Sequence, residues 1–166
     1  MYLLGLPFVY CVAYVVLFFG FPFFFTNSFS KIHRGSIASI VSIFVCYSVV
    51  LFLSSSISSP ELANRILHTL GGGSLVVLIC FLAVKDSGVK IKSFQFFIMS
   101  ISIAILFGVA NEILEYILQN HFGFIFADSV NDTWLDLISN TVGALLASIC
   151  LIPFIKKDFL NVWKKI

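Results

Sequence analysis

Long apolar segments separated by short polar joints make up most of this chain. A transmembrane helix needs about 20 apolar residues to cross roughly 30 Å of hydrocarbon. Five segments meet or approach that length: residues 3–25, 36–53, 63–84, 94–118 and 133–155. The pattern predicts an all-α, polytopic transmembrane helix bundle. We expect one transmembrane domain over residues 1–166, because the polar joints are too short to hold a soluble domain.

Local signals mark the third segment. Ser59 is a favourable N-cap, Pro60 suits the first helical position, and Glu61 places an acid in the first turn. Gly71–Gly73 follow inside the same segment. Such small residues let a neighbouring membrane helix approach closely, and they could equally make this helix locally irregular.

Composition places the chain in the membrane. It is 60% hydrophobic and 11% charged, with a mean hydropathy of +1.07, whereas soluble domains carry about 25% charged residues. The cysteines all lie in apolar runs without metal-ligand spacing and are interpreted as small buried hydrophobes. No phosphate-binding loop or nucleic-acid signature is present, so we expect the lipid bilayer as a partner and no nucleic acid.

The placement of basic residues predicts the orientation. With five spans, nine of the ten Lys and Arg residues fall on one side of the membrane, and only Arg65 falls opposite. The positive-inside rule therefore predicts an outside N-terminus and a cytoplasmic C-terminus in a multi-pass protein of the cytoplasmic (inner) membrane. The nine residues are Lys31, Arg34, Lys85, Lys90, Lys92, Lys156, Lys157, Lys164 and Lys165.

Polar side chains within the last three segments identify a candidate site. Ionisable groups are costly in hydrocarbon and usually functional there. Glu112 and Glu115 are three residues apart and share a helix face, while Asp132, Asp136 and Asn140 repeat every four residues. All of them lie near the expected outer ends of their helices. The expected ligand-binding residues are His68, Glu112, Glu115, Asp132, Asp136, Asn140 and Arg65.

Each of these residues also has a structural interpretation. Arg65 could pair with Glu61 at the i,i+4 spacing or face a phosphate. Asp132 could cap the last helix, and Asn140 could link helices by hydrogen bonds. The first two segments carry no ionisable side chain within hydrocarbon, and we expect them to act mainly as an apolar buttress.

Charge balance suggests what the site could hold. Four acids with only Arg65 nearby cannot all stay ionised in a poorly solvated site without compensation. A divalent cation on Glu112, Glu115, Asp136 and His68 would supply it, and these ligands suit Mg²⁺, Mn²⁺ or Zn²⁺. Retained protons would be the other solution.

The spacing of these residues is similar to that in known membrane proteins. Three motifs resemble those of the VanZ-like and YjdF-like small bacterial membrane proteins over roughly residues 60–150. The resemblance implies a cell-envelope protein; VanZ proteins are associated with low-level teicoplanin resistance. VanZ-type sequences often carry a basic residue before the Asp-rich helix, and residues 123–131 have none, so glycopeptide resistance is not implied. The motifs are His68-x-x-Gly71-Gly72, Glu112-x-x-Glu115 and Asp132-Thr133-x-x-Asp136-Leu137-x-x-Asn140-x-x-Gly143.

Three functions remain open from the sequence. The first is an envelope protein whose outward-facing site binds a lipid or cell-wall-precursor head group or a divalent cation. The second is a metal-assisted hydrolase or transferase acting on a phospholipid or polyprenyl-phosphate. The third is a small proton- or ion-coupled permease. The almost wholly apolar runs at residues 75–84 and 96–107 favour an outward-facing site over a channel.

Overall fold

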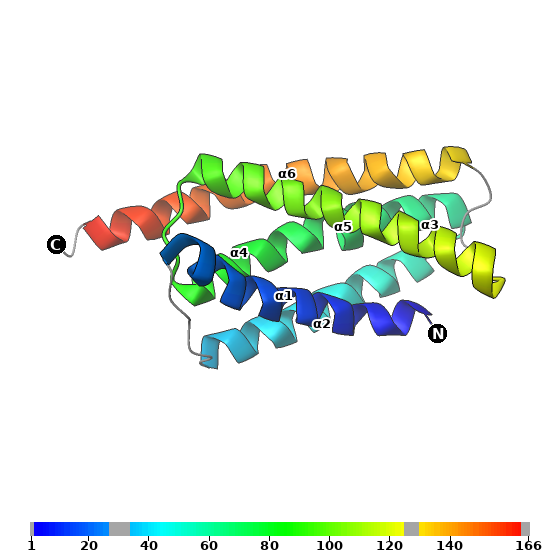
Figure 1. Ribbon diagram of the computed structural model, residues 1–166. Coiled ribbons are helices and arrows are strands. Elements are labelled where there is room, and N and C mark those ends of the chain that lie inside the picture. The colour runs from blue at the N-terminus through cyan, green and yellow to red at the C-terminus, as the bar shows by residue number, and fades with distance from the viewer. Residues whose placement is uncertain (1, 27–33, 125–129, 164–166) are drawn as a thin grey trace.

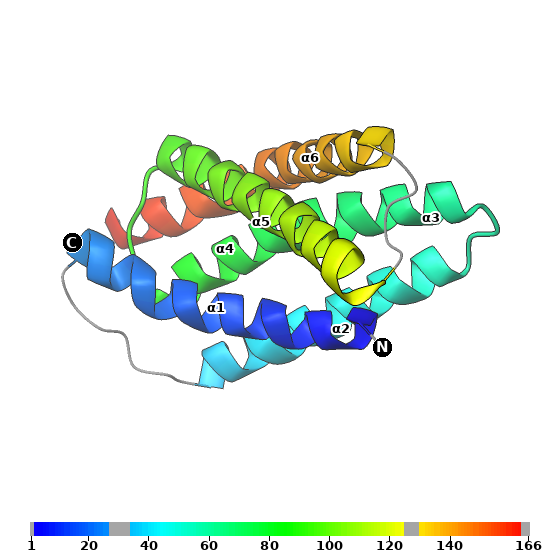
Figure 2. The ribbon, with the colours of Figure 1, turned by 45° about the vertical axis from the view of Figure 1, so that its right-hand side comes forward.

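The computed structural model describes residues 2–26, 34–124 and 130–163. None of these residues forms a strand, and their helices lie lengthwise along one bundle (Figures 1 and 2). Lys31, Lys164 and Lys165, used in the sequence analysis, lie outside the described residues. The elements are α1 (Tyr2–Thr26), α2 (Arg34–Ser55), α3 (Pro60–Ile66), the π-helix η1 (Leu67–Ser74), α4 (Leu75–Ser87), α5 (Ser93–Phe122) and α6 (Val130–Trp163).

The all-α fold with five spans is confirmed in the described residues. Five helical stretches there are long and apolar enough to cross a membrane. The third, Pro60–Ser87, consists of α3, η1 and α4 in sequence. It begins as predicted, because Ser59 accepts a hydrogen bond from the Leu62 amide at 3.4 Å and Pro60 occupies the first turn.

Helix α4 forms the centre of the bundle. It contacts α1, α2, α5 and α6, and Val76, Val77, Ile79, Cys80 and Ala83 are all buried. A helix that is apolar on every side is expected to be enclosed by others. The bundle's outer surface is also apolar, as membrane-spanning helices require.

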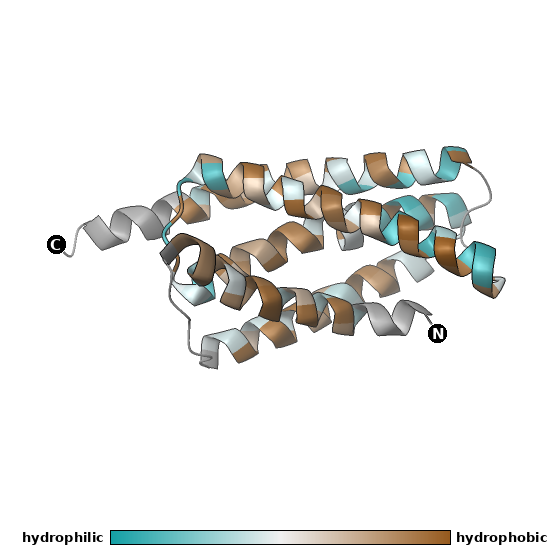
Figure 3. Cartoon of the chain, viewed as in Figure 1, coloured by the Kyte–Doolittle hydropathy of each residue, from teal (hydrophilic) through white to brown (hydrophobic). Residues whose placement is uncertain are grey.

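The two ends of the bundle differ in polarity. At one end α3 and α6 begin while α2 and α5 end, and hydrophilic residues gather there on α3, α5 and α6 (Figure 3). We call this the polar end. At the opposite end α4 finishes and α5 begins; Lys85, Lys90 and Lys92 lie in this region. We call it the lysine end.

Helices α1 and α2 do more than buttress the bundle, so that expectation was incomplete. The Tyr14 hydroxyl donates a hydrogen bond to the Asp86 carboxylate at 2.7 Å, and the Ser39 hydroxyl donates to it at 2.5 Å. Asp86 lies near the end of α4. Hydroxyls from the first two helices thereby satisfy an acid on the third span. This contact ties α1, α2 and α4 together at the lysine end.

Candidate functional site

A π-helix carries the site's histidine. Residues Leu67–Ser74 form η1, which contains His68 and the three consecutive glycines. π-helical turns are rare and often occur at functional sites. The Ser74 hydroxyl lies 3.0 Å from the Thr69 carbonyl and 3.1 Å from the Gly143 carbonyl, so it can donate to backbone acceptors of both η1 and α6. The glycines thus accompany a local irregularity, one of the two outcomes left open by the sequence.

The other outcome, close helix approach, is also found. A Cβ on Gly73 would overlap the backbone carbonyl of Asn140, and a Cβ on Gly143 would overlap the backbone carbonyl of Thr69. Neither overlap can be relieved by a side-chain rotation, because the obstructing atoms belong to the main chain. η1 and α6 therefore pack backbone against backbone. This packing places His68 next to Asp136 and Asn140 of α6.

Three spans bring ligand atoms to one point. The potential ligand atoms of His68, Glu112 and Asp136 all lie within 4.8 Å of one another. His68 Nε2 is 3.4 Å from Asp136 Oδ1. His68 and Asp136 are buried, with 9% and 2% of their surface exposed, and Glu112 is partly buried. We call these three residues the His-carboxylate cluster.

Arg65 pairs with aspartates of α6 and not with Glu61, one of the two alternatives that the sequence left open. Its guanidinium forms ion pairs with both Asp132 and Asp136 and donates to the Asp132 carbonyl at 3.3 Å. Glu61 is exposed to the surroundings. A buried charge needs a partner more than an exposed one does. The Arg65 guanidinium therefore pairs with Asp132 and Asp136, which are less exposed than Glu61.

Asn64 is a member of the site that the sequence analysis overlooked. Its amide nitrogen lies 3.1 Å from Asp136 Oδ1 and 3.3 Å from Oδ2. Asp136 is therefore surrounded by Asn64, Arg65 and His68, all from the third span. The available signal was the spacing: Asn64 precedes His68 by four residues, the distance that places two side chains on one helix face.

The paired glutamates occupy different environments. Glu115 accepts a hydrogen bond from the Asn111 amide at 2.7 Å, and it is not among the three residues of the His-carboxylate cluster. Glu112 is in that cluster, and its Oε1 is buried with no hydrogen-bond partner among the described residues. A buried polar atom without a partner calls for an explanation, such as a bound ion.

Asn140 contacts Nδ1, the ring nitrogen of His68 that does not face Asp136. Its Nδ2 lies 3.3 Å from His68 Nδ1, while its Oδ1 is buried and has no hydrogen-bond partner in the described part of the chain. In this arrangement Nδ1 accepts, so the ring proton is on Nε2 and faces Asp136. If the amide is reversed, Oδ1 accepts from Nδ1–H, which frees the Nε2 lone pair for a metal ion. Gly72 and Gly108 make room for this side chain.

The fixed charges around the site are predominantly negative. Asp132, Asp136, Glu112 and Glu115 face a single described cation, Arg65, which is already paired with the two aspartates. The two glutamates are left without an ion pair to Lys or Arg among the described residues. Because charges interact strongly in a poorly solvated interior, the site is expected to attract cations.

Comparison with known proteins gives one result. A family model described as a predicted membrane protein (DUF2238) matches residues 5–157, which include the described site and all five of the candidate membrane spans. This match supports a small membrane protein family and contains nothing specific to the VanZ-like or YjdF-like proteins. No curated protein and no solved structure matches the chain.

Proposed function

The chain belongs to the predicted membrane protein family DUF2238, and we propose that it binds a divalent cation inside the membrane on the His-carboxylate cluster. One imidazole and two carboxylates form a donor set suited to Mn²⁺ or Zn²⁺. Three protein ligands leave coordination positions for a further group. Glu115, which the sequence placed among the ligands, is assigned here to the surroundings of the site.

The observation that carries this proposal is the buried Glu112 oxygen without a hydrogen bond. It belongs to a group of ligand atoms that lie within 4.8 Å of one another. A structural polar network satisfies its buried members. A bound cation would give this oxygen a partner, and would also favour the Asn140 orientation in which Oδ1 accepts from His68 Nδ1–H and the Nε2 lone pair is free.

The open coordination positions suggest a role at the cell envelope. If the polar end faces outward, as the distribution of Lys and Arg predicts, the cation could bridge to a lipid or cell-wall-precursor head group. This proposal agrees with the VanZ-like spacing of the α6 motif. It places the activity at the outer leaflet of the cytoplasmic membrane.

A binding site open at one end fits the interior better than a transport path. Between the cluster and the lysine end, α4 presents buried apolar side chains, among them Val76, Ile79 and Cys80. The buried hydroxyls of Ser100 and Ser148 bond to each other at 3.1 Å. They therefore do not extend a polar path from the cluster.

Metal analysis of a matched pair of variants tests the proposal. Protein purified in detergent should retain about one Mn²⁺ or Zn²⁺ per chain after dialysis, because both metals suit this donor set. Glu112→Gln should lose the ion, whereas Glu115→Gln, with the same change of charge three residues away, should retain it. Equal retention by both variants, or no retention by the wild type, would contradict the proposal.

Acidification provides a second readout on the same samples. A metal ligand must be deprotonated, so protons compete with the ion at His68 and at both carboxylates. Affinity should therefore fall as the pH is lowered and recover when the pH is raised. An affinity that does not change with pH would show that the ion binds elsewhere.

A further inference from the structure

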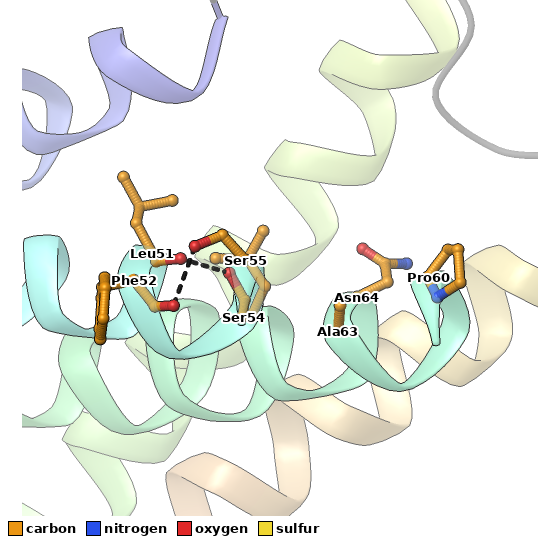
Figure 4. Close-up of a pocket in the computed structure, with 8 residues that line it drawn as sticks. Leu51, Phe52, Ser54, Ser55, Pro60, Ala63 and Asn64 are labelled. Atoms are coloured by element: carbon orange, nitrogen blue, oxygen red, sulfur yellow. Dashed lines mark hydrogen bonds between the residues drawn. The ribbon is translucent and has the colours of Figure 1, made fainter. Parts of the chain in front are cut away.

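A groove lies beside the His-carboxylate cluster, between the end of α2 and the start of the third span (Figure 4). Its volume is about 470 Å³, which falls in the range of small-molecule sites, roughly 300–1,000 Å³. Both flanking helices are long and apolar enough to span the membrane, so the groove opens towards lipid. It is lined by Leu51, Phe52, Ser54, Ser55, Pro60, Ala63, Asn64 and Leu67.

The lining is amphipathic along the direction of the membrane normal. Pro60 and Ser55 lie at the helix ends, while Leu67 lies about 10 Å deeper at 1.5 Å per residue. Leu51, Phe52 and Leu67 provide the apolar surface, and Phe52 is 71% exposed. A hydrocarbon chain below a polar head group has the same order of polarity.

The polar atoms of the groove are hydrogen-bond acceptors. The hydroxyl groups of Ser54 and Ser55 donate to the carbonyls of Leu51 and Phe52, each at 2.9 Å. The Asn64 amide nitrogen is used by Asp136, and in Figure 4 the amide oxygen lies on the side nearer Ser55. The groove therefore offers hydroxyl and amide oxygens to a ligand that donates.

Charge favours the same kind of ligand. Asn64 joins the groove to Asp136, and the surrounding acids outnumber the one described cation near them, Arg65. We propose that this groove binds a phospholipid with a primary ammonium head group. One acyl chain packs on Leu51 and Phe52, and the ammonium donates to the oxygens of Ser55 and Asn64.

A second copy of the chain fits the groove less well. In a two-fold symmetric contact the same patch faces itself, so acceptors would meet acceptors near like charges. A lipid ammonium supplies both the donors and the positive charge. The proposed lipid site is separate from the proposed metal site, and lipid binding in the groove does not require a metal ion.

Photocrosslinking in vesicles tests the lipid site. The full chain is reconstituted in phosphatidylglycerol vesicles with a small fraction of phosphatidylethanolamine carrying a diazirine on one acyl chain. Phosphatidylcholine with the same chain is the control, because its quaternary ammonium has the charge without N–H donors. Adducts are mapped by mass spectrometry. We expect residues 51–67 to carry roughly tenfold more ethanolamine lipid, since charge-assisted hydrogen bonds have about that effect on affinity.

A pair of tryptophan variants distinguishes the groove from the general lipid surface. Ala63→Trp fills the groove and should reduce the adducts about tenfold, as expected for the lost burial of about two methylene groups. Ala110→Trp, at an exposed position of α5, should leave them unchanged. Helicity reports on folding, and it should match the wild type in each variant.

Three outcomes would overturn the lipid assignment. These are equal labelling by the two lipids, adducts that persist in a folded Ala63→Trp protein, and disulfide-linked dimers of a Ser55→Cys variant, with its native cysteines replaced by alanine, in vesicles without the lipid probe. None of these outcomes bears on the proposed function, because metal retention by Glu112→Gln and Glu115→Gln is measured separately. Loss of metal from Glu112→Gln with unchanged lipid adducts would support two separate sites.

Discussion

At the scale of single residues, Asp136 organises the site. It is 2% exposed and receives contacts from Asn64, Arg65 and His68. A carboxylate this deeply buried is tolerated only when charge and hydrogen bonds compensate its lost hydration. Asp136 is well supplied in this respect, whereas Glu112 has no ion pair with a described Lys or Arg and its buried Oε1 has no hydrogen-bond partner among the described residues. This oxygen is the part of the cluster that a bound cation would satisfy.

The first prediction concerns Asn140, which positions the imidazole. Replacing a group that orients a metal ligand typically lowers metal affinity about 10- to 100-fold, and we expect this loss for Asn140→Leu. Asn140→Asp should retain binding, because its carboxylate still accepts from His68 Nδ1–H. Titration with Mn²⁺ or Zn²⁺ measures the effect. Asn120→Leu, at an exposed position, is the control, and wild-type affinity in Asn140→Leu would exclude the positioning role.

At the scale of elements, glycine packing fixes the distance between η1 and α6. The missing side chains of Gly73 and Gly143 leave room for main-chain carbonyls of the opposite helix. In a membrane, where apolar surface gains little by leaving lipid, such close backbone packing is a principal source of helix association. The same contact holds His68 against Asp136, so stability and site geometry depend on one interface.

The second prediction separates this interface from ordinary helix propensity. Gly143→Ala should destabilise the protein by about 1–3 kcal/mol, as overpacking does, and should weaken metal binding. Gly20→Ala in α1 adds the same methyl group where nothing lies within 4 Å. It should be neutral or slightly stabilising, because glycine is a poor helix former. Thermal unfolding in detergent compares the two, and a Gly143→Ala protein as stable as the wild type would contradict the packing argument.

At the scale of the whole molecule, the hydropathy pattern and helical spacing predicted the helices, whereas contacts between residues distant in sequence could not be predicted. The spans and the shared faces of α5 and α6 follow from hydropathy and helical spacing, which are local properties. The partners of Arg65 and Asp86 could not be predicted from local patterns, because these partners are distant in sequence. Tyr14 and Ser39, for example, lie 72 and 47 residues from Asp86. A single sequence contains no record of such distant contacts. The π-helix was likewise only one of two outcomes open to three glycines.

The last prediction concerns which way the bundle lies in the membrane. Lys85, Lys90 and Lys92 are in the region of the lysine end, whereas Arg65 near the polar end is paired with aspartates. The positive-inside rule then places the polar end outside. In a variant whose native cysteines are replaced by alanine, Asn120→Cys should react with a membrane-impermeant maleimide on intact cells. Lys90→Cys should react only after permeabilisation, and both positions are exposed. The reverse pattern would place the His-carboxylate cluster on the cytoplasmic side. Its ligand would then have to come from the cytoplasm or the inner leaflet, which would remove the argument for an envelope substrate while leaving the metal site itself intact.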